Sequence, residues 1–314
     1  MPIEQPQPSL PQSGRYSPLR YPGGKGKIAR FIRDIIRLNG LSDGRYVEPY
    51  AGGAAVAWEL LITGVVRRVV INDINRPVYA FWNSVLTRTD ALCSLIEKTI
   101  LTVEEWDRQK AIFRNHETAD ELDLGFAFFF LNRTNRSGIL NGGVIGGREQ
   151  TGKWKIDARY NKPELISRIR KISALRSRIE LSCMDAQAFL AEKSPEWKAN
   201  TLVYIDPPYF EKGRYLYYDA YAPEDHASIA ESIQRLSHVS WIVSYDDVSP
   251  IHTHYQEFPW LQYTLNYSAR TSSRGREAMF FSRNLEIPGV RSPLVEIDRD
   301  AQTPTRPLEA RVFA

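Results

Sequence analysis

The stretch Leu202-Val203-Tyr204-Ile205-Asp206-Pro207-Pro208-Tyr209 predicts the end of a buried strand and, beside it, a binding edge. Four strand-forming residues run straight into an acid and two prolines, and proline has no amide hydrogen with which to continue a sheet. Asp206 is therefore expected at a strand's carboxyl end, where open α/β sheets bind ligands. There the Asp206 carboxylate and the Pro207 carbonyl can each accept a hydrogen of an exocyclic amine, while Tyr209 stacks on the ring that carries it. On these residues alone, a Pro-Pro loop that merely ends a core strand is the alternative.

Composition indicates a globular chain of 314 residues, 43% hydrophobic, which is enough for one large domain or one domain with an insertion. No apolar run is long enough to span a bilayer and no signal-peptide pattern is present, so we expect a cytoplasmic protein without a membrane partner. Cys93 and Cys183 have no Cys or His at metal-ligand spacing. We expect packed thiols and no zinc or other metal site.

Basic charge is concentrated in residues 132–178. That stretch holds twelve Lys or Arg and three acids, net +9, so the rest of a chain with total charge +4 carries −5. A basic block in an otherwise acidic protein is typical of a polyanion partner, with nucleic acid the first candidate. The charges after residue 162 fit a solvated helix face instead, whereas those of residues 133–155 lie in a glycine-rich stretch without helical periodicity.

Residues 45–62 predict a strand, a glycine turn and a helix, with Glu48 ending the strand and Gly52 and Gly53 in the turn. The next strand, 68–72, is followed by Asp73, about 20 residues beyond the glycines, where nucleotide-binding folds place the acid that binds ribose hydroxyls. The full dinucleotide fingerprint is missing, which favours another adenosine-bearing ligand over a nicotinamide. A turn or helix-capping role is the alternative for Asp73.

Near the amino terminus, the glycine-rich segment Tyr21-Pro22-Gly23-Gly24-Lys25 leads into an amphipathic helical pattern. Backbone donors and Lys25 suit a carboxylate or polar head group, and an ordinary helix-entry loop is the alternative. Walker-motif spacing is absent, which argues against a triphosphate. Residues 1–18 and 287–314 are proline-rich, and we expect both to be disordered.

Residues 76–178 separate Asp73 from the next sheet strand and are mostly helical in pattern. An apolar run at 126–131 predicts core and delivers the polar residues 132–138 to the surface, ahead of a loop at 141–154. The sheet then resumes at 179–182, ending near Asp185, and finishes with a hairpin whose turn holds Arg270 and Arg274. That turn predicts a phosphate-facing loop, with solubilising charge as the alternative.

Five motifs in this order resemble the Dam-like (D12 class) DNA N6-adenine methyltransferases, over roughly residues 20–281. The motifs are Tyr21-Pro22-Gly23-Gly24-Lys25, Val47-Glu48-Pro49-Tyr50-Ala51-Gly52-Gly53, Asn72-Asp73-Ile74-Asn75, Leu131-Asn132-Arg133-Thr134-Asn135-Arg136-Ser137-Gly138 and Asp206-Pro207-Pro208-Tyr209. The resemblance implies an α/β fold with a seven-stranded, Rossmann-like sheet that binds S-adenosyl-L-methionine. It also implies a discontinuous catalytic domain, residues 19–75 and 179–286, and an inserted, mostly helical DNA-recognition domain, residues 76–178.

The resemblance implies an enzyme that transfers a methyl group from S-adenosylmethionine to N6 of an adenine flipped out of double-stranded DNA. The candidate catalytic residues are Asp206, Pro207, Pro208 and Tyr209. Taken with the strand ends and glycine turns, the candidate cofactor-binding residues are Tyr21, Lys25, Glu48, Gly52, Gly53, Asp73, Asp185 and Asp206. The candidate DNA-binding residues are Asn132, Arg133, Asn135, Arg136, Ser137, Lys153, Lys155, Arg270 and Arg274.

One residue departs from the family pattern, because Ala54 stands where many relatives have a further glycine. Its methyl group is tolerated if φ is negative there.

Three other functions stay open at this stage. An RNA or protein-glutamine methyltransferase also sets a planar amine or amide against such a Pro-Pro-Tyr motif, but the Lys25 motif and the basic insert count against both. A non-catalytic DNA-binding protein would need neither Asp73 nor Asp206. The protein is expected to act as a monomer, and a cognate restriction endonuclease sharing its site remains open, as does the recognition sequence.

Overall fold

The computed structural model describes residues 16–20, 25–211, 221–265, 276–289 and 294–296. The predictions for Tyr21, Arg270 and Arg274 lie outside these residues. In the part described, no helix is both long and apolar enough to cross a membrane.

A mixed sheet with strand order β3-β2-β1-β4-β5-β7-β6-β8 organises the molecule. β1 to β5 run parallel, and β6, β7 and β8 join antiparallel. The chain therefore has the predicted α/β fold. The strands are β1 Arg45–Glu48, β2 Arg68–Asn72, β3 Ile179–Ser182, β4 Thr201–Ile205, β5 Ser240–Asp246, β6 Trp260–Leu265, β7 Arg276–Phe281 and β8 Leu294–Glu296.

Two expectations about the ends of the chain are wrong. The sheet has an eighth strand, β8, which pairs with β6 inside the segment predicted to be disordered. At the other end, residues 16–18 are ordered, and Ser17 is buried with its hydroxyl donating to the Gly53 carbonyl at 2.6 Å. Both segments gain order from partners far along the chain, which local composition does not report.

Helices cover both faces of the sheet. The apolar sides of α1 and α2 pack with strand residues such as Tyr46, Ile71 and Tyr204 on one face. α8, α10 and α11 pack with the alternating residues, such as Val47 and Val203, on the other. The helices around the sheet are η1 Lys25–Ile28, a 3-10 turn, α1 Ala29–Leu38, α2 Ala55–Ile62, α8 Ala186–Lys193, α10 Pro223–Gln234 and α11 Ser249–His254.

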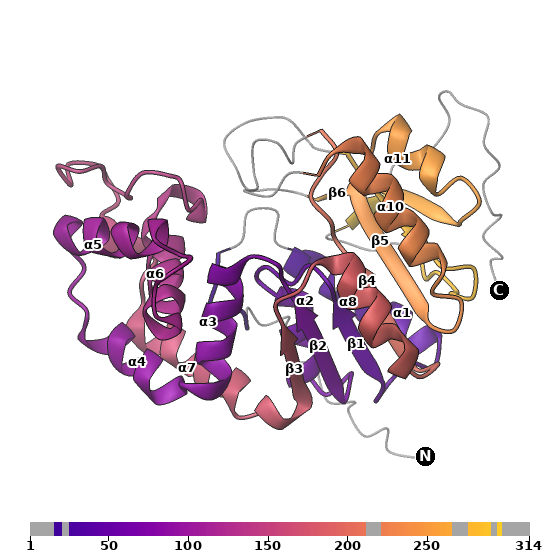
Figure 1. The fold of residues 1–314 in the computed structure, drawn as a ribbon, viewed down its shortest axis with the longest axis horizontal. Helices are drawn as coiled ribbons and strands as arrows, with labels where there is room; N and C mark the ends of the chain where they lie inside the picture. The colour runs from indigo at the N-terminus through magenta and orange to yellow at the C-terminus, as the bar shows by residue number, and fades with distance from the viewer. Residues whose placement is uncertain (1–15, 21–24, 212–220, 266–275, 290–293, 297–314) are drawn as a thin grey trace, which may run out of the picture.

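Five helices, α3 to α7, intervene between β2 and β3 and gather at the end of the molecule away from β6 (Figure 1). α6 carries the apolar run at 126–131, all of it buried as predicted. Gly125 brings α6 so close to α3 that a Cβ there would lie 2.6 Å from the Ala80 carbonyl oxygen. These helices are α3 Arg76–Thr87, α4 Thr89–Lys98, α5 Val103–Arg114, α6 Glu121–Thr134 and α7 Lys162–Ser173.

The strand order places a switch in winding direction between β1 and β4. From β1 the chain proceeds to β2 on one side, whereas β4 and β5 lie on the other side of β1. In such sheets, ligands bind outside the carboxyl ends of the strands at this switch in direction. Glu48 ends β1 and Asp206 follows β4, so the sheet places both at the switch point.

Candidate active site at the switch point

Asp206 comes directly after β4 and shares the face of Tyr204, because side chains alternate along a strand. The Ser244 hydroxyl donates to Asp206 Oδ1 at 2.7 Å, and the Lys25 ammonium lies 3.4 Å from the same oxygen. Burial raises the pKa of Asp206, while Lys25 and Ser244 oppose the shift by favouring the charged form. The side chain keeps 24% of its surface exposed, so it remains open to a ligand.

Lys25 reaches this edge from η1 and is itself buried. Its ammonium donates to Glu277 Oε2 at 2.6 Å and to the Tyr209 hydroxyl at 3.0 Å. Burial alone lowers the pKa of Lys25, but Asp206 and the surrounding tyrosines raise it well above the usual value, so the side chain stays charged.

Glu277 is a central residue that sequence reasoning missed. Its carboxylate accepts from Lys25, from the Tyr209 hydroxyl at 3.0 Å and from the Tyr263 hydroxyl at 2.7 Å. β7 runs antiparallel to β5, so its second residue lies at the same edge as the carboxyl ends of the parallel strands. The sequence did carry one sign of its role, since Glu277 precedes a run of apolar residues in a strand. A buried acid is rare unless it has a charged partner.

The loop after Asp206 is held by Asp246, a second residue that the sequence did not single out. The buried Asp246 carboxylate accepts the backbone amides of Phe210 and Glu211 at 2.9 and 3.0 Å. Pro207 is buried, and Pro208 and Tyr209 are partly exposed. The predicted catalytic residues therefore sit on a loop whose two ends are both fixed to the sheet.

The glycine turn after β1 is held from three sides. The Gly52 amide donates to Asp73 Oδ2 at 2.8 Å, Trp82 Nε1 donates to the Gly52 carbonyl at 2.9 Å, and Ser17 binds Gly53. Asp73 also accepts the Asn75 amide at 2.9 Å through Oδ1. Asp73 thus makes the hydrogen bonds of a turn residue, which is the alternative role given for it above. Its binding of ribose hydroxyls stays a prediction.

Ala54 contradicts the expectation of a negative φ, because its φ is +45° and its ψ is +35°. The residue begins α2 in the left-handed conformation, which costs an L-residue roughly 1–2 kcal/mol. Its methyl group is buried in the core that α2 shares with the sheet. The tight turn is therefore kept without the glycine, at the cost of local strain.

Two further acids differ in their availability to a ligand. Glu48 is 5% exposed and accepts the Tyr46 hydroxyl at 3.0 Å, and burial raises its pKa to about 8. At neutral pH it is mostly a carboxylic acid that can donate a hydrogen bond. Asp185 is exposed and caps α8, since its Oδ1 accepts the amides of Gln187 and Ala188.

Asn132 and Asn135 were predicted to face DNA, and this is wrong. Asn132 is 1% exposed, accepts the Arg20 amide at 2.7 Å and donates to the Arg20 carbonyl at 2.8 Å. Asn135 is fully buried, accepts from Trp106 Nε1 at 2.6 Å and donates to the carbonyls of Ile139 and Leu140. With their amide groups engaged inside the fold, neither can reach a base edge.

The basic residues of the same region fall into two groups. Arg133 is turned into the fold, where its guanidinium donates to the carbonyls of Arg159 and Pro18. Exposed residues are Arg136, Ser137, Lys153 and Lys155, and Lys155 also donates to the Gln150 carbonyl. The DNA-binding assignments of these four remain predictions.

Comparison with known proteins adds the family. A family model described as D12 class N6 adenine-specific DNA methyltransferase matches residues 21–269. The Type II methyltransferase M.MjaIII of Methanocaldococcus jannaschii is 26% identical over 207 residues, which are 61% of this chain and 68% of the relative.

Solved structures resemble the chain only distantly. The rRNA methyltransferase aviRa from Streptomyces viridochromogenes covers 82% of this chain and 84% of its own at 12% identity, with a TM-score of 0.33. LPL1258 from Legionella pneumophila covers 82% and 86% at 13% identity, with a TM-score of 0.30. TM-scores this low do not support any inference about function. The motifs, their order and the family model together identify the chain as a member of the D12 class of N6 adenine-specific DNA methyltransferases.

Proposed function

We propose that this DNA adenine methyltransferase holds an extruded adenine at Asp206 to Tyr209 and takes its methyl group from S-adenosyl-L-methionine. One observation carries the proposal: a carboxylate fixed by Ser244 and Lys25 lies at the switch point beside the partly exposed Tyr209. Extrusion is needed because the amine of a stacked base cannot reach a sheet edge.

Asp206 has one oxygen for positioning and one for the substrate. Among the described residues, Ser244 and Lys25 both contact Oδ1, which leaves Oδ2 to accept an amine hydrogen. The Pro207 carbonyl is the second acceptor, and the Tyr209 ring offers a stacking face. When these two acceptors hold both hydrogens of the adenine amine, the lone pair of N6 is directed toward the methyl group. Methyl transfer requires this positioning.

The residues at the switch point fit S-adenosylmethionine in chemistry. Asp73 and Asp185 offer acceptors for hydroxyl and amine donors, the protonated Glu48 is a donor, and the Gly52-Gly53 turn has no side chains to keep a ligand away. We assign the cofactor to these residues together with Lys25 and Asp206. When bound, the cofactor supplies a methyl group already activated as a sulfonium.

Methyl transfer to duplex DNA, RNA and protein substrates tests the proposal. With labelled S-adenosylmethionine, the parent should yield N6-methyladenine in duplex DNA, and Asp206→Ala should yield none. Glu196→Gln changes an exposed acid that precedes the amino end of β4, and it should match the parent. Product in RNA or on a glutamine amide would replace the DNA assignment.

Cofactor binding is tested separately at Asp73. Asp73→Ala should weaken S-adenosylmethionine binding at least tenfold, about 1.4 kcal/mol, because charge-assisted hydrogen bonds to hydroxyls are lost. Since Asp73 also holds Gly52, calorimetry should be paired with the melting temperature. A lowered melting temperature with unchanged affinity would leave Asp73 as a turn residue only.

We also propose that α3 to α7 and the loop at 141–154 read the DNA sequence, and that the protein acts as a monomer, since all the proposed catalytic groups come from one chain. Sequencing genomic DNA from expressing cells with modified-base detection gives the recognition sequence. Light scattering with and without DNA gives the oligomeric state. A restriction endonuclease that shares the site should fail to cut DNA from those cells.

A further inference from the structure

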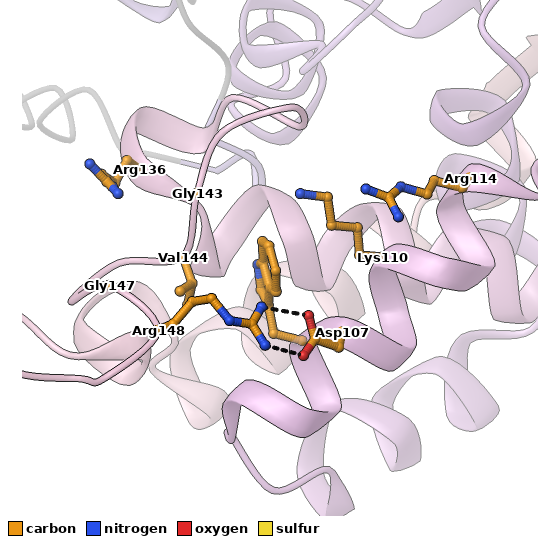
Figure 2. Close-up of a pocket in the computed structure, with 9 residues that line it drawn as sticks. Asp107, Lys110, Arg114, Arg136, Gly143, Val144, Gly147 and Arg148 are labelled. Atoms are coloured by element: carbon orange, nitrogen blue, oxygen red, sulfur yellow. Dashed lines mark hydrogen bonds and ion pairs between the residues drawn. The ribbon is translucent and has the colours of Figure 1, made fainter.

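A pocket of about 440 Å³ lies in the helical insert, between α5 and the segment that follows α6 (Figure 2). Lys110 and Arg114 extend from α5, while Arg136 and Arg148 come from the opposite segment. With Asp107 as the one acid in its lining, the pocket has three positive charges in excess. The lining residues are Trp106, Asp107, Lys110, Arg114, Arg136, Gly143, Val144, Gly147 and Arg148.

Arg148 is the only one of the four cations with a carboxylate partner in the described part of the chain. Its guanidinium forms two hydrogen bonds with Asp107, at 2.9 and 2.7 Å. Lys110 lies over the Trp106 ring, 4.4 Å from its centroid, and Arg114 and Arg136 have no ion pair in this part of the structure. Four cations around a single acid repel one another, which is unfavourable for folding alone, so the cluster is suited to an anionic ligand.

The backbone around the pocket accommodates Arg136 specifically. The Arg136 amide donates to the Gly143 carbonyl at 3.0 Å, and a Cβ at Gly143 would lie 3.1 Å from Arg136 Nη2. The glycine therefore lets the guanidinium lie against the chain on the pocket side. The planar donor group of Arg136 is suited to bidentate recognition of phosphate.

The lining favours a phosphate over a base. Trp106 is 5% exposed and its Nε1 is already bonded to Asn135, so it offers no free stacking face. The volume exceeds that of one small anion and suits a stretch of sugar-phosphate backbone. We propose that this pocket binds DNA backbone phosphate, and that Asp107 competes with the phosphate for Arg148. The proposal rests on the proposed DNA substrate.

Asp107 then acts as an internal competitor. Its pKa is lowered by the hydrogen bonds from Arg148, so it is ionised at neutral pH. Both partners of the pair are largely exposed, and exposed ion pairs are weak. A phosphate that enters beside Lys110 and Arg136 can replace the Asp107 carboxylate on Arg148. Because Asp107 must be displaced, the affinity for DNA is lower than four unpaired cations would give.

The test is DNA affinity as a function of salt. Asp107→Asn and Asp107→Ala should both bind duplex DNA more tightly than the parent, with an advantage that shrinks as salt rises, because one more cation is free to release counterions. Lys110→Gln and Arg114→Gln should bind more weakly and each reduce the salt slope by about one. Glu196→Gln and Lys198→Gln, exposed residues outside the pocket, are the charge-matched controls.

The outcomes separate this proposal from the proposed function. If Asp107→Asn binds no more tightly than Glu196→Gln while all variants still methylate duplex DNA, the pocket proposal is overturned and the function stands. If inorganic phosphate displaces DNA from the parent as well as from Lys110→Gln, with the same inhibition constant, the pocket is not the phosphate site. If the parent neither binds nor methylates DNA, the proposed function fails and this proposal fails with it.

Discussion

At the scale of single residues, Glu277 joins Lys25, Tyr209 and Tyr263 at the edge of the sheet that carries the proposed catalytic residues. Glu277→Gln should slow single-turnover methylation at least tenfold, since hydrogen bonds to charged groups contribute about 1.5–3 kcal/mol. Glu277 also raises the pKa of Asp206 through like charge, so the acid limb of the pH–rate profile should move to lower pH in the variant. Glu257→Gln, an exposed acid paired with Arg283, is the control. A slower enzyme with an unshifted profile would reduce Glu277 to a packing role.

Tyr209 combines a ring for stacking with a hydroxyl tied to Lys25 and Glu277. Tyr209→Ala should lose roughly 1–3 kcal/mol of base stacking and slow methylation strongly, whereas Tyr209→Phe and Tyr209→Trp keep a ring face and should retain substantial activity. Single-turnover rates on one duplex decide it. Equal, severe losses in the Phe and Ala variants would assign the essential role to the hydroxyl.

Glu48 makes stability depend on pH. Its pKa is raised from 4.5 to about 8 by burial, so folding favours the neutral acid. The stabilising contribution is complete below about 4.5 and is lost as pH rises through about 8. The free energy of unfolding should therefore fall over this range by an amount on the order of a few kcal/mol. Denaturation of Glu48→Gln should show a flatter dependence than the parent, and parallel curves would mean that Glu48 is ionised in the fold.

Which residues the sequence could predict depends on how local their determinants are. The position of Asp206 at a strand's end was predicted correctly, because prolines end a strand by their own chemistry. The surroundings of Asn132 and Asn135 were predicted wrongly. A sequence does not distinguish a buried asparagine that is hydrogen-bonded to backbone groups from an exposed asparagine that contacts a base. Glu277 was missed because its partners come from η1, from the loop after β4 and from β6, and only the folded sheet brings these together.

At the scale of elements, the close contact between α3 and α6 depends on Gly125. A Cβ there would meet the Ala80 carbonyl oxygen at 2.6 Å, and backbone atoms on both sides would have to move. Gly125→Ala should destabilise the protein by about 1–3 kcal/mol, even though alanine favours helix. At Gly26, where a Cβ would meet Ala55 Cβ at an ordinary 3.6 Å, Gly26→Ala serves as the control. A higher melting temperature for Gly125→Ala would show that the helices separate without cost.

Among the parallel strands, β2 and β4 were readable from sequence, because each is a short, mostly apolar run that ends at a polar or turn residue. β8 was not, since three residues acquire strand geometry only by pairing with β6. The positive φ of Ala54 could not be predicted from the sequence either. It is fixed by the geometry of the turn, against the backbone preference of alanine for negative φ.

At the scale of the whole molecule, the sheet and the helical insert share one hydrophobic core. The cluster that holds Tyr46 and Ile71 of the sheet also holds Phe81, Phe129 and Phe130 of α3 and α6. Residues 17–20 also connect the sheet to the helical insert. The Ser17 hydroxyl donates to the Gly53 carbonyl, and the Ser17 carbonyl accepts from Arg168 of α7. The sequence suggested a catalytic part and an insert with a boundary near residue 76, but it carried no sign that apolar packing continues across that boundary.

A continuous core predicts that the two parts unfold together. Hydrogen exchange followed through a denaturant series should give α6 and β4 the same opening free energy, because the aromatic side chains of α6 belong to the same hydrophobic core as Tyr204 of β4. Phe129→Ala, which removes a ring stacked on Phe81 at 5.5 Å, should cost about 3–5 kcal/mol and lower the protection of β4 as much as that of α6. Phe189→Ala, in α8 on the other face of the sheet, is the matched control and should also lower both. Loss of protection confined to α3–α7 in the Phe129 variant would show an insert that folds and unfolds as a separate unit.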